Sequence, residues 1–224
     1  MAWFSSARSA TVRKEQTRVP TAVEPVVRRS LALAALFEAI RGRKVTVLDL
    51  GSAVGSNVEF LSRYGCKLYI EDLYAALASR VATGEEGDAA GPEFFTEFLS
   101  VPEGTRFDVV LAWDLFNYLR RKELGFFGEL LRRYTEPGAM TFALMSYHKQ
   151  IPAQPYRFKI QDEERLIYDR RTALERPSPR FVPYEVTGLL KGFRVDRSFL
   201  LQHGIQEYLL VREEEQPADD GAVA

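Results

Sequence analysis

A glycine-containing turn after a buried strand pattern is the part of this sequence best suited to chemistry. Residues 47–55 read VLDLGSAVG, so Asp49 lies in the apolar run, and Gly51 and Gly55 follow it. In open α/β sheets, ligands bind beyond the carboxyl ends of the strands. Gly51 permits a tight turn and a close approach of the backbone to a ligand, and Gly55 would let the next helix pack near the strand. The turn therefore predicts a ligand-binding loop.

Two acids, Glu71 and Asp72, end the next strand pattern about 20 residues after the turn, where a carboxylate can bind the ribose of a nucleoside cofactor. A register slip of one residue reverses the face of a strand, so both acids stay candidates, with an exposed loop charge as the alternative. The turn lacks the Gly-x-Gly-x-x-Gly fingerprint of nicotinamide oxidoreductases, and the sequence lacks the Gly-Lys-Ser/Thr loop of ATPases and GTPases. These spacings argue against both classes.

Strand and helix patterns alternate along the chain, which places the turn and the two acids at one edge of a sheet. Alternation implies an α/β fold with parallel strands and helices on both faces, because right-handed crossovers place them there. Apolar, β-branched runs predict strands at 45–50, 67–70, 107–113 and 139–145, with a short third strand at 94–99. The spacing of apolar residues predicts helices at 24–41, 56–64, 73–82 and 121–134.

The last third of the chain departs from this alternation. Residues 193–201 and 206–211 predict an antiparallel hairpin, and 183–190 predict a short helix before it. The segment 147–181 is an insertion with a small hairpin pattern at 156–168. This insertion is either a lid over a site or an extra hairpin that buries a sheet edge.

The turn at residues 49–55 resembles motif I of the class I S-adenosylmethionine-dependent methyltransferases, whose pattern is Asp/Glu-x-Gly-x-Gly-x-Gly. Asp49, Gly51 and Gly55 match it. Ala53 stands at the middle glycine, where its methyl group would either crowd the cofactor or require the loop to shift. The resemblance covers about residues 24–212. It implies a Rossmann-like, seven-stranded, mostly parallel sheet with helices on both faces and an antiparallel C-terminal hairpin.

The resemblance also implies roles for individual residues in binding S-adenosylmethionine. Asp49 would lie near the methionine end of the cofactor, and Asp72 or Glu71 at its ribose. Glu97 or Thr96 is the nearest match for the adenine contact. The strand that begins at Phe107 is similar to the family's fourth strand, so Trp113 and Asp114 would face the methyl-transfer region, unless they pack in the core and cap a helix. The expected cofactor-binding residues are Asp49, Gly51, Ser52, Ala53, Gly55, Glu71, Asp72, Glu97, Trp113 and Asp114.

The acceptor side of the reaction is less specified, because methyl transfer from a sulfonium needs orientation more than a fixed catalytic group. Asp114, Asn117 and His148 are the catalytic candidates, with His148 either a general base or a plain loop residue. Residues 114–118 read DLFNY without a proline pair, which argues against a nucleic-acid or protein amide and amine methylase. Residues that could line an acceptor pocket are Tyr147, Tyr156 and Arg157.

The composition limits the classes of binding partner that the chain is expected to have. The 224 residues include 30 basic and 31 acidic ones, a balance that gives no footprint for nucleic acid. Cys66 is the single cysteine, which permits no internal disulfide and favours the cytoplasm, and two distant histidines predict no metal site. No apolar run is long enough to cross a membrane.

We therefore expect one domain over residues 23–212, between a flexible basic tail at 1–22 and an acidic disordered tail at 213–224. The expected function is that of an S-adenosylmethionine-dependent methyltransferase acting on a small molecule or a protein side chain. The alternative is a catalytically inactive domain of the same fold that serves as a binding or scaffold module.

Overall fold

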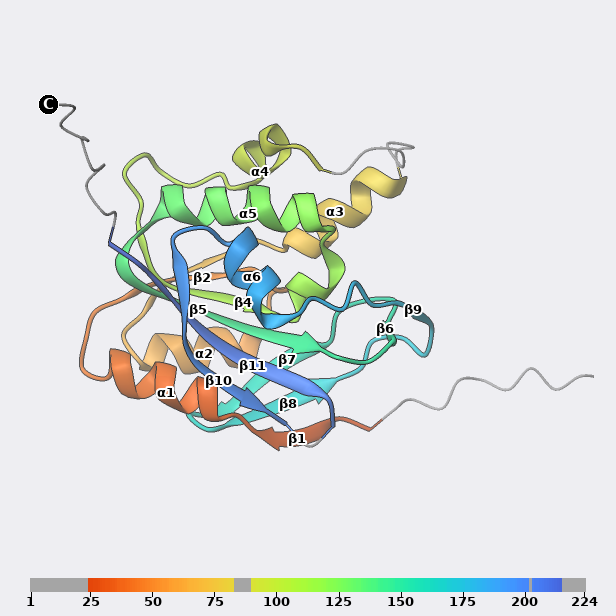
Figure 1. The fold of residues 1–224 in the computed structure, drawn as a ribbon. Helices are drawn as coiled ribbons and strands as arrows, with labels where there is room; N and C mark the ends of the chain where they lie inside the picture. The colour runs from red at the N-terminus through yellow and green to blue at the C-terminus, as the bar shows by residue number, and fades with distance from the viewer. Residues whose placement is uncertain (1–23, 83–89, 202, 215–224) are drawn as a thin grey trace, which may run out of the picture.

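The central sheet has six strands in the order β10-β11-β5-β4-β2-β3. In this computed structural model the described residues are 24–82, 90–201 and 203–214 (Figure 1). Four strands run parallel to one another, and the last two form the predicted antiparallel hairpin. Their bounds are β2 Thr46–Asp49, β3 Lys67–Ile70, β4 Phe107–Trp113, β5 Thr135–Ser146, β10 Phe193–Leu200 and β11 Ile205–Arg212.

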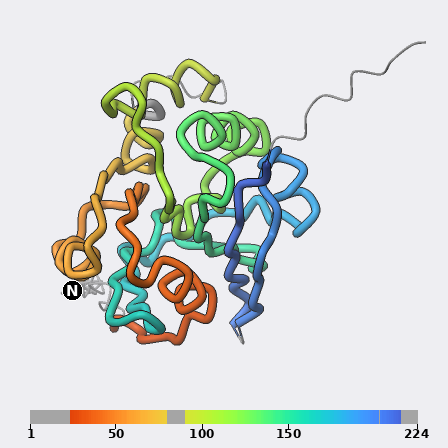
Figure 2. The backbone as a smooth tube through the Cα atoms, turned by 90° about the vertical axis from the view of Figure 1, so that its left-hand side faces the viewer, coloured from red at the N-terminus to blue at the C-terminus, as the bar shows by residue number. Residues whose placement is uncertain are grey.

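Helices cover both faces of this sheet, as the alternating pattern predicts (Figures 1 and 2). Alternate residues of β4 divide between two buried clusters, with Val109 in one and Val110 in the other. The Val109 cluster includes α1 and α2, and the Val110 cluster includes the other four helices. The bounds are α1 Leu31–Ile40, α2 Gly55–Arg63, α3 Leu73–Ala82, α4 Pro92–Phe98, α5 Arg121–Tyr134 and α6 Pro183–Leu189.

The expected third strand at 94–99 is wrong, because these residues form α4, so the described part of the sheet has six strands instead of seven. Phe95 and Leu99 are buried four residues apart, and Phe94 stacks on Phe98 at the same spacing. This spacing suits a helix and not a strand, in which alternate residues share a face. Pro92 at the first turn is also typical of a helix start.

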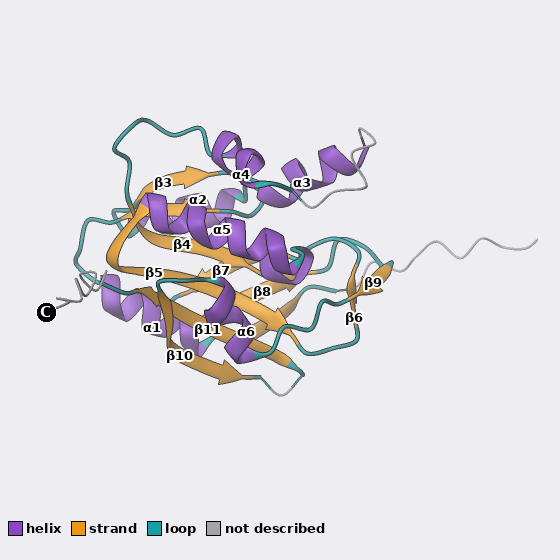
Figure 3. Cartoon of the chain, turned by 45° about the horizontal axis from the view of Figure 1, so that its top comes forward, coloured by secondary structure: helices purple, strands orange, loops and turns teal. Residues whose placement is uncertain are grey.

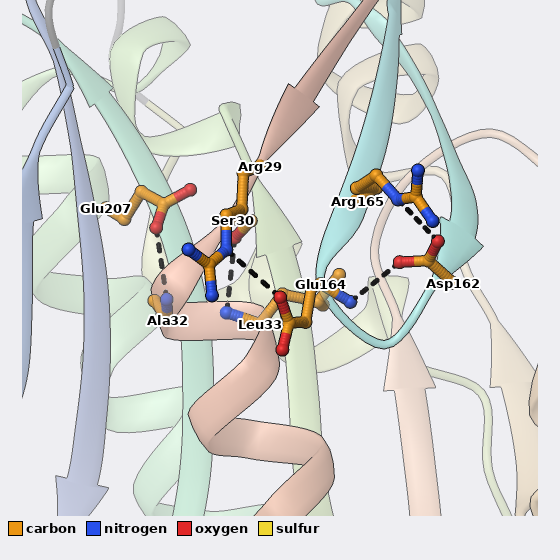
Figure 4. Close-up of polar contacts among 8 residues, drawn as sticks. All are labelled: Arg29, Ser30, Ala32, Leu33, Asp162, Glu164, Arg165 and Glu207. Carbon is orange, nitrogen blue, oxygen red and sulfur yellow. Dashed lines mark hydrogen bonds and ion pairs between the residues drawn. The ribbon is translucent and has the colours of Figure 1, made fainter.

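The expected helix at 24–41 is shorter than predicted, because its first part is β1, Val26–Arg29. Two adjacent β-branched residues, Val26 and Val27, favour an extended backbone. Ser30 then starts α1, and its Oγ accepts a hydrogen bond from the backbone N–H of Leu33 at 3.2 Å (Figure 4). Glu207 from β11 accepts a second hydrogen bond, from Ala32 N–H at 3.0 Å. The helix start is thus fixed by residues from both ends of the chain.

The insertion forms two small sheets, and one of them shares a buried cluster with α1 and α2 on one face of the central sheet (Figures 1 and 3). The predicted hairpin is confirmed as β7, Arg157–Asp162, and β8, Arg165–Asp169, and β1 pairs with β8. Arg29 of β1 also bridges to Glu164 in the hairpin turn (Figure 4). The second sheet pairs β6, Gln150–Pro152, with β9, Glu175–Pro177. The N-terminal strand and the insertion therefore form one structural unit.

The predicted tail at 1–22 lies outside the described residues, as does most of the tail at 213–224. Among the described residues, no helix combines the length and the apolar character that crossing a membrane requires.

Removing the Ser30 hydroxyl should lower the free energy of unfolding by about 1 kcal/mol, because one buried N–H at the start of α1 then has no acceptor. The measurement is urea denaturation of Ser30→Ala. Ser79→Ala is the matched control, since Ser79 Oγ donates to a carbonyl on an exposed helix face, and it should change stability by less than about 0.5 kcal/mol. Equal losses in both variants would contradict the capping role.

Candidate cofactor and acceptor site

Asp49 is a buried carboxylate at the end of β2, with only 1% of its surface exposed. Its Oδ1 accepts a hydrogen bond from Gly51 N–H at 2.9 Å and another from Trp113 Nε1–H at 2.6 Å. Burial raises the pKa of Asp49 to about 6, although both hydrogen bonds act to lower it. The carboxylate therefore organises the glycine turn and the end of β4 around itself.

Gly51 is required by the position of the Trp113 ring. A Cβ atom at Gly51 would lie 2.9 Å from Trp113 Cδ1 and 3.3 Å from Asp49 Oδ1. Any larger residue would thus displace the indole from the turn. At Gly55, by contrast, a Cβ would meet nothing within 4 Å, so the close helix packing expected there is absent.

Trp113 links this turn to the insertion. Its φ is +50°, an uncommon value for a residue with a side chain. Its ring stacks on Phe158 of β7, with ring centroids 5.4 Å apart and 6° between the planes. Asn57 of α2 adds two hydrogen bonds to the same strand, donating to Phe158 O and accepting from Ile160 N–H. The insertion is therefore attached to both sides of the turn.

A small cavity of about 30 Å³ lies over the turn, lined by Gly51, Ser52, Asp72 and Trp113 among others. The residues fit S-adenosylmethionine in chemistry, since they offer a bare glycine backbone and the carboxylates of Asp72 and Asp114, whereas the buried Asp49 does not line the cavity. The cavity is too small for S-adenosylmethionine in this structure, because its volume is roughly that of one water molecule. Pro155, Tyr156 and Arg171 of the insertion close the cavity. A nucleoside-sized ligand can enter only if these covering residues move.

Of the two acids after β3, Asp72 lines this cavity and Glu71 does not. Asp72 Oδ1 accepts a hydrogen bond from Ala75 N–H at 2.9 Å, so the carboxylate also caps the start of α3. Ala53 is exposed and is not among the lining residues. Its methyl group therefore lies outside this cavity.

Glu97 is not brought to the cavity. It lies exposed on α4, and Thr96 on the same helix donates its hydroxyl to Pro92 O. Both residues fell within the third strand expected at 94–99, and these residues form α4 instead. Neither residue lines the cavity over the glycine turn.

A second, larger cavity of about 320 Å³ adjoins the first, and Asp114 lines both of them. Asp114 is 7% exposed, and its Oδ2 accepts a hydrogen bond from Tyr156 N–H at 3.1 Å. Burial raises the pKa of Asp114 to about 7, against the effect of that hydrogen bond. Such a carboxyl group can both hold and release a proton near neutral pH.

The other acceptor candidates differ in how they lie in the larger cavity. Asn117 lines it, but its amide is already bonded to three backbone groups, those of Asp114, Leu144 and Ser146. His148 is exposed and also lines it, and Tyr156 lines both cavities. Tyr147 and Arg157 line neither. Among the described residues, no group of three His, Cys, Asp or Glu side chains is arranged to hold a metal.

Several residues at these cavities were not identified from the sequence. Asn57 and Phe158 connect α2 to β7, and Arg28 and Tyr168 line the larger cavity. A lone amide among the apolar residues of a helix could have marked Asn57. Arg28 could not be found, because it was assigned to a helix and lies in β1.

Replacing Asp114 should make the free energy of unfolding fall less as pH rises. Its pKa is higher in the folded protein than the usual 3.8, so the stabilisation is present at low pH and disappears as pH rises to about 7. The free energy of unfolding of Asp114→Asn, relative to that of the native chain, should increase by up to roughly 4 kcal/mol between about pH 4 and pH 8, at about 1.4 kcal/mol per pKa unit. The measurement is urea denaturation across pH, with exposed Asp196→Asn as control. Parallel curves for the native chain and Asp114→Asn would refute the shift.

The fold is similar to that of a solved methyltransferase. The sequence matches no protein-family model and no curated protein. A solved S-adenosylmethionine-dependent methyltransferase from Clostridium acetobutylicum ATCC 824 aligns with 82% of this chain and 92% of its own, at 12% identity and a TM-score of 0.51. Another, from Mesorhizobium loti, aligns with 81% and 98% at 12% identity and a TM-score of 0.49. The chain therefore has the fold of the Clostridium acetobutylicum methyltransferase.

Proposed function

We propose that this protein is an S-adenosylmethionine-dependent methyltransferase that acts on a small molecule or a protein side chain. One observation carries the proposal. Adjacent parallel strands β2 and β3 end in Asp49 and, two residues later, Asp72, and the cavity between the glycine turn and Asp72 opens beside a larger one. This is the arrangement that places a nucleoside cofactor next to an acceptor. We also propose a cytoplasmic location, since a single cysteine permits no internal disulfide.

Each residue of the turn has a role in this proposal. Asp49 fixes the turn and lies near the methionine end of the cofactor, while Gly51 and Ser52 present backbone to it. Asp72 accepts hydrogen bonds from the ribose hydroxyls. When bound, the cofactor supplies a methyl group already activated on a positively charged sulfur, so the protein has to orient the acceptor and exclude water.

The insertion 147–181 acts as the lid in this proposal. Its residues close the cavity over the turn, and aromatic stacking and hydrogen bonds hold it there. Tyr74 and Tyr118 add two more bonds, donating their hydroxyls to Ala153 O and Pro152 O. Closure would exclude water from the reacting groups, and opening would admit the cofactor.

Titration of the full chain with S-adenosylmethionine and S-adenosylhomocysteine by calorimetry should give dissociation constants in the micromolar range. Asp72→Ala should weaken both at least about tenfold, because the ribose loses a charged hydrogen-bond acceptor. Gly51→Val should abolish binding, because its side chain must displace Trp113 from the turn.

Glu97→Ala is the matched control for Asp72→Ala, since it removes an exposed acid on α4 and should leave both constants unchanged. No binding at millimolar ligand by the folded native chain would refute the proposed function. Unaltered binding by Asp72→Ala would refute the ribose assignment alone.

Movement of the lid should change the fluorescence of Trp113. The chain has two tryptophans, Trp3 and Trp113. In a Trp3→Phe background, S-adenosylhomocysteine should change the fluorescence of Trp113, because the insertion carries Phe158, which stacks on the Trp113 ring, and must shift for the cavity to enlarge. Stopped-flow mixing should show a rate that saturates with ligand, as expected when opening precedes binding. Binding by calorimetry without any fluorescence change would contradict a moving lid.

A further inference from the structure

Asp114 places a carboxylate at the wall that the two cavities share, since it lines both of them and is 7% exposed. Its Oδ2 accepts a hydrogen bond from Tyr156 N–H at 3.1 Å. Its Oδ1 bonds to no other residue that the structure describes and is not one of the fully enclosed polar atoms, so it remains accessible. Within residues 24–82, 90–201 and 203–214, no basic side chain forms an ion pair with Asp114. The carboxylate is therefore nearly buried, without a cation, and accessible from the cavities.

A carboxylate in this position favours a ligand that carries a positive charge. Burying an ionised group without a counter-charge is costly, and burial accordingly raises the pKa of Asp114 to about 7. An ammonium group is a cation with three hydrogen-bond donors and no acceptor, so it would pair with the ionised carboxylate and offset that cost. A hydroxyl group could donate one hydrogen bond but would leave the charge unpaired. The wall therefore favours an amine over an alcohol and disfavours an anion.

The other charged side chains at the larger cavity do not remove this preference. Glu175 and Arg170 pair with each other at 3.1 Å. Arg28 is directed to the C-terminal hairpin, where its Nη1 lies 3.0 Å from His203 Nδ1. Glu24 is exposed and adds a further negative charge. Counting the carboxylate at the shared wall, three acids and two arginines line this cavity, so acidic groups are in excess.

The walls of the larger cavity are rich in aromatic rings. Tyr118, Tyr156, Phe158 and Tyr168 all line it. Aromatic faces pack well against a flat ring, and they also attract a cation. The volume of about 320 Å³ suits a ligand with one ring. A single aromatic ring with a short chain that ends in an amine therefore matches both the walls and the carboxylate.

We propose that the larger cavity binds a small arylalkylamine, with its ammonium group on the Asp114 carboxylate and its ring between the aromatic walls. The proposal rests on the proposed function, since it makes the amine nitrogen the methyl acceptor. Asp114 lines both cavities, so the nitrogen that it binds lies at their junction, on the side from which a methyl group would come.

The transfer would need one proton to leave the ammonium group first, because a protonated nitrogen has no free electron pair. Asp114 would take up that proton. The nitrogen pair would then form the bond to the methyl carbon of the cofactor, while the electrons of the carbon–sulfur bond would go to sulfur. The products would be the N-methylated ammonium ion, the neutral thioether and protonated Asp114, which afterwards releases its proton to water. A base is most effective when its pKa is near the working pH, and that of Asp114 is about 7.

The test is calorimetric titration of the full chain at about pH 7.5 with 2-phenylethylamine, 2-phenylethanol and phenylacetate. Each ligand carries one phenyl ring on a short chain, and at this pH their end groups are a cation, a neutral hydroxyl and an anion. The amine should bind at least about tenfold more tightly than the alcohol, because only the amine pairs with the charge of Asp114. Phenylacetate should bind most weakly.

Asp114→Asn should abolish the preference for the amine and leave alcohol binding unchanged, because asparagine keeps the shape of the side chain and can still accept from Tyr156 N–H. Tyr156→Leu should weaken the amine and the alcohol alike, since it removes an aromatic wall. Asp196→Asn is the matched control, because Asp196 is an acid of β10 that pairs with Arg194, and it should change neither affinity. Urea denaturation first establishes that each variant is folded.

Equal binding of amine and alcohol, no binding of either at millimolar concentration, or an amine preference that survives in Asp114→Asn would each overturn the proposal. Added S-adenosylmethionine should give N-methyl-2-phenylethylamine by mass spectrometry, and its absence would overturn the acceptor role. Titration with S-adenosylhomocysteine separates the two claims. Cofactor binding without an amine preference would overturn this inference and leave the proposed function standing. An amine preference without cofactor binding would support the amine site and refute the methyltransferase assignment.

Discussion

A carboxylate buried without a cation constrains most of what surrounds it. Asp49 is held by two neutral donors, Gly51 N–H and the Trp113 indole. Satisfying the carboxylate therefore fixes the turn after β2 and draws a large ring from the end of β4 onto it. The ring in turn requires a glycine beneath it and an aromatic partner above it, which Phe158 of the insertion provides. One hydrogen-bonding requirement thus explains the glycine, the unusual backbone of Trp113 and the closeness of the insertion.

The insertion converts the open carboxyl edge of the sheet into two adjacent cavities. Asn57, Tyr74 and Tyr118 bind its backbone from three different elements, so its position does not depend on a single contact. Asp114 remains at the boundary between the cavities with a carboxyl group that titrates near neutral pH. Low dielectric surroundings strengthen each of these polar contacts, and the same surroundings make any unpaired group more costly.

Apolar runs made β2, β4 and β5 predictable from the sequence, because burial on both faces leaves little choice of residue. The helical spacing of apolar residues made α5 predictable, because only one of its faces is buried. The strand predicted at 94–99 was wrong, because aromatic residues occur in both strands and helices. Only the spacing of Phe95 and Leu99 distinguishes a helix from a strand here. Asp49, Gly51 and Asp72 were found because they follow directly from strand ends. Arg28 and Tyr168 could not be, because only the tertiary pairing of β1 with β8 brings them together at the larger cavity.

The pairing of β1 with β8 has a consequence for the order in which ligands bind. Four residues of β1, Val26–Arg29, are hydrogen-bonded along β8, so the hairpin cannot swing away from the sheet without carrying Arg28 with it. The movement that admits a cofactor over Gly51 would then also displace Arg28 and Tyr168, which line the larger cavity. The cofactor would have to bind before the acceptor. The bound acceptor would then keep the cofactor enclosed.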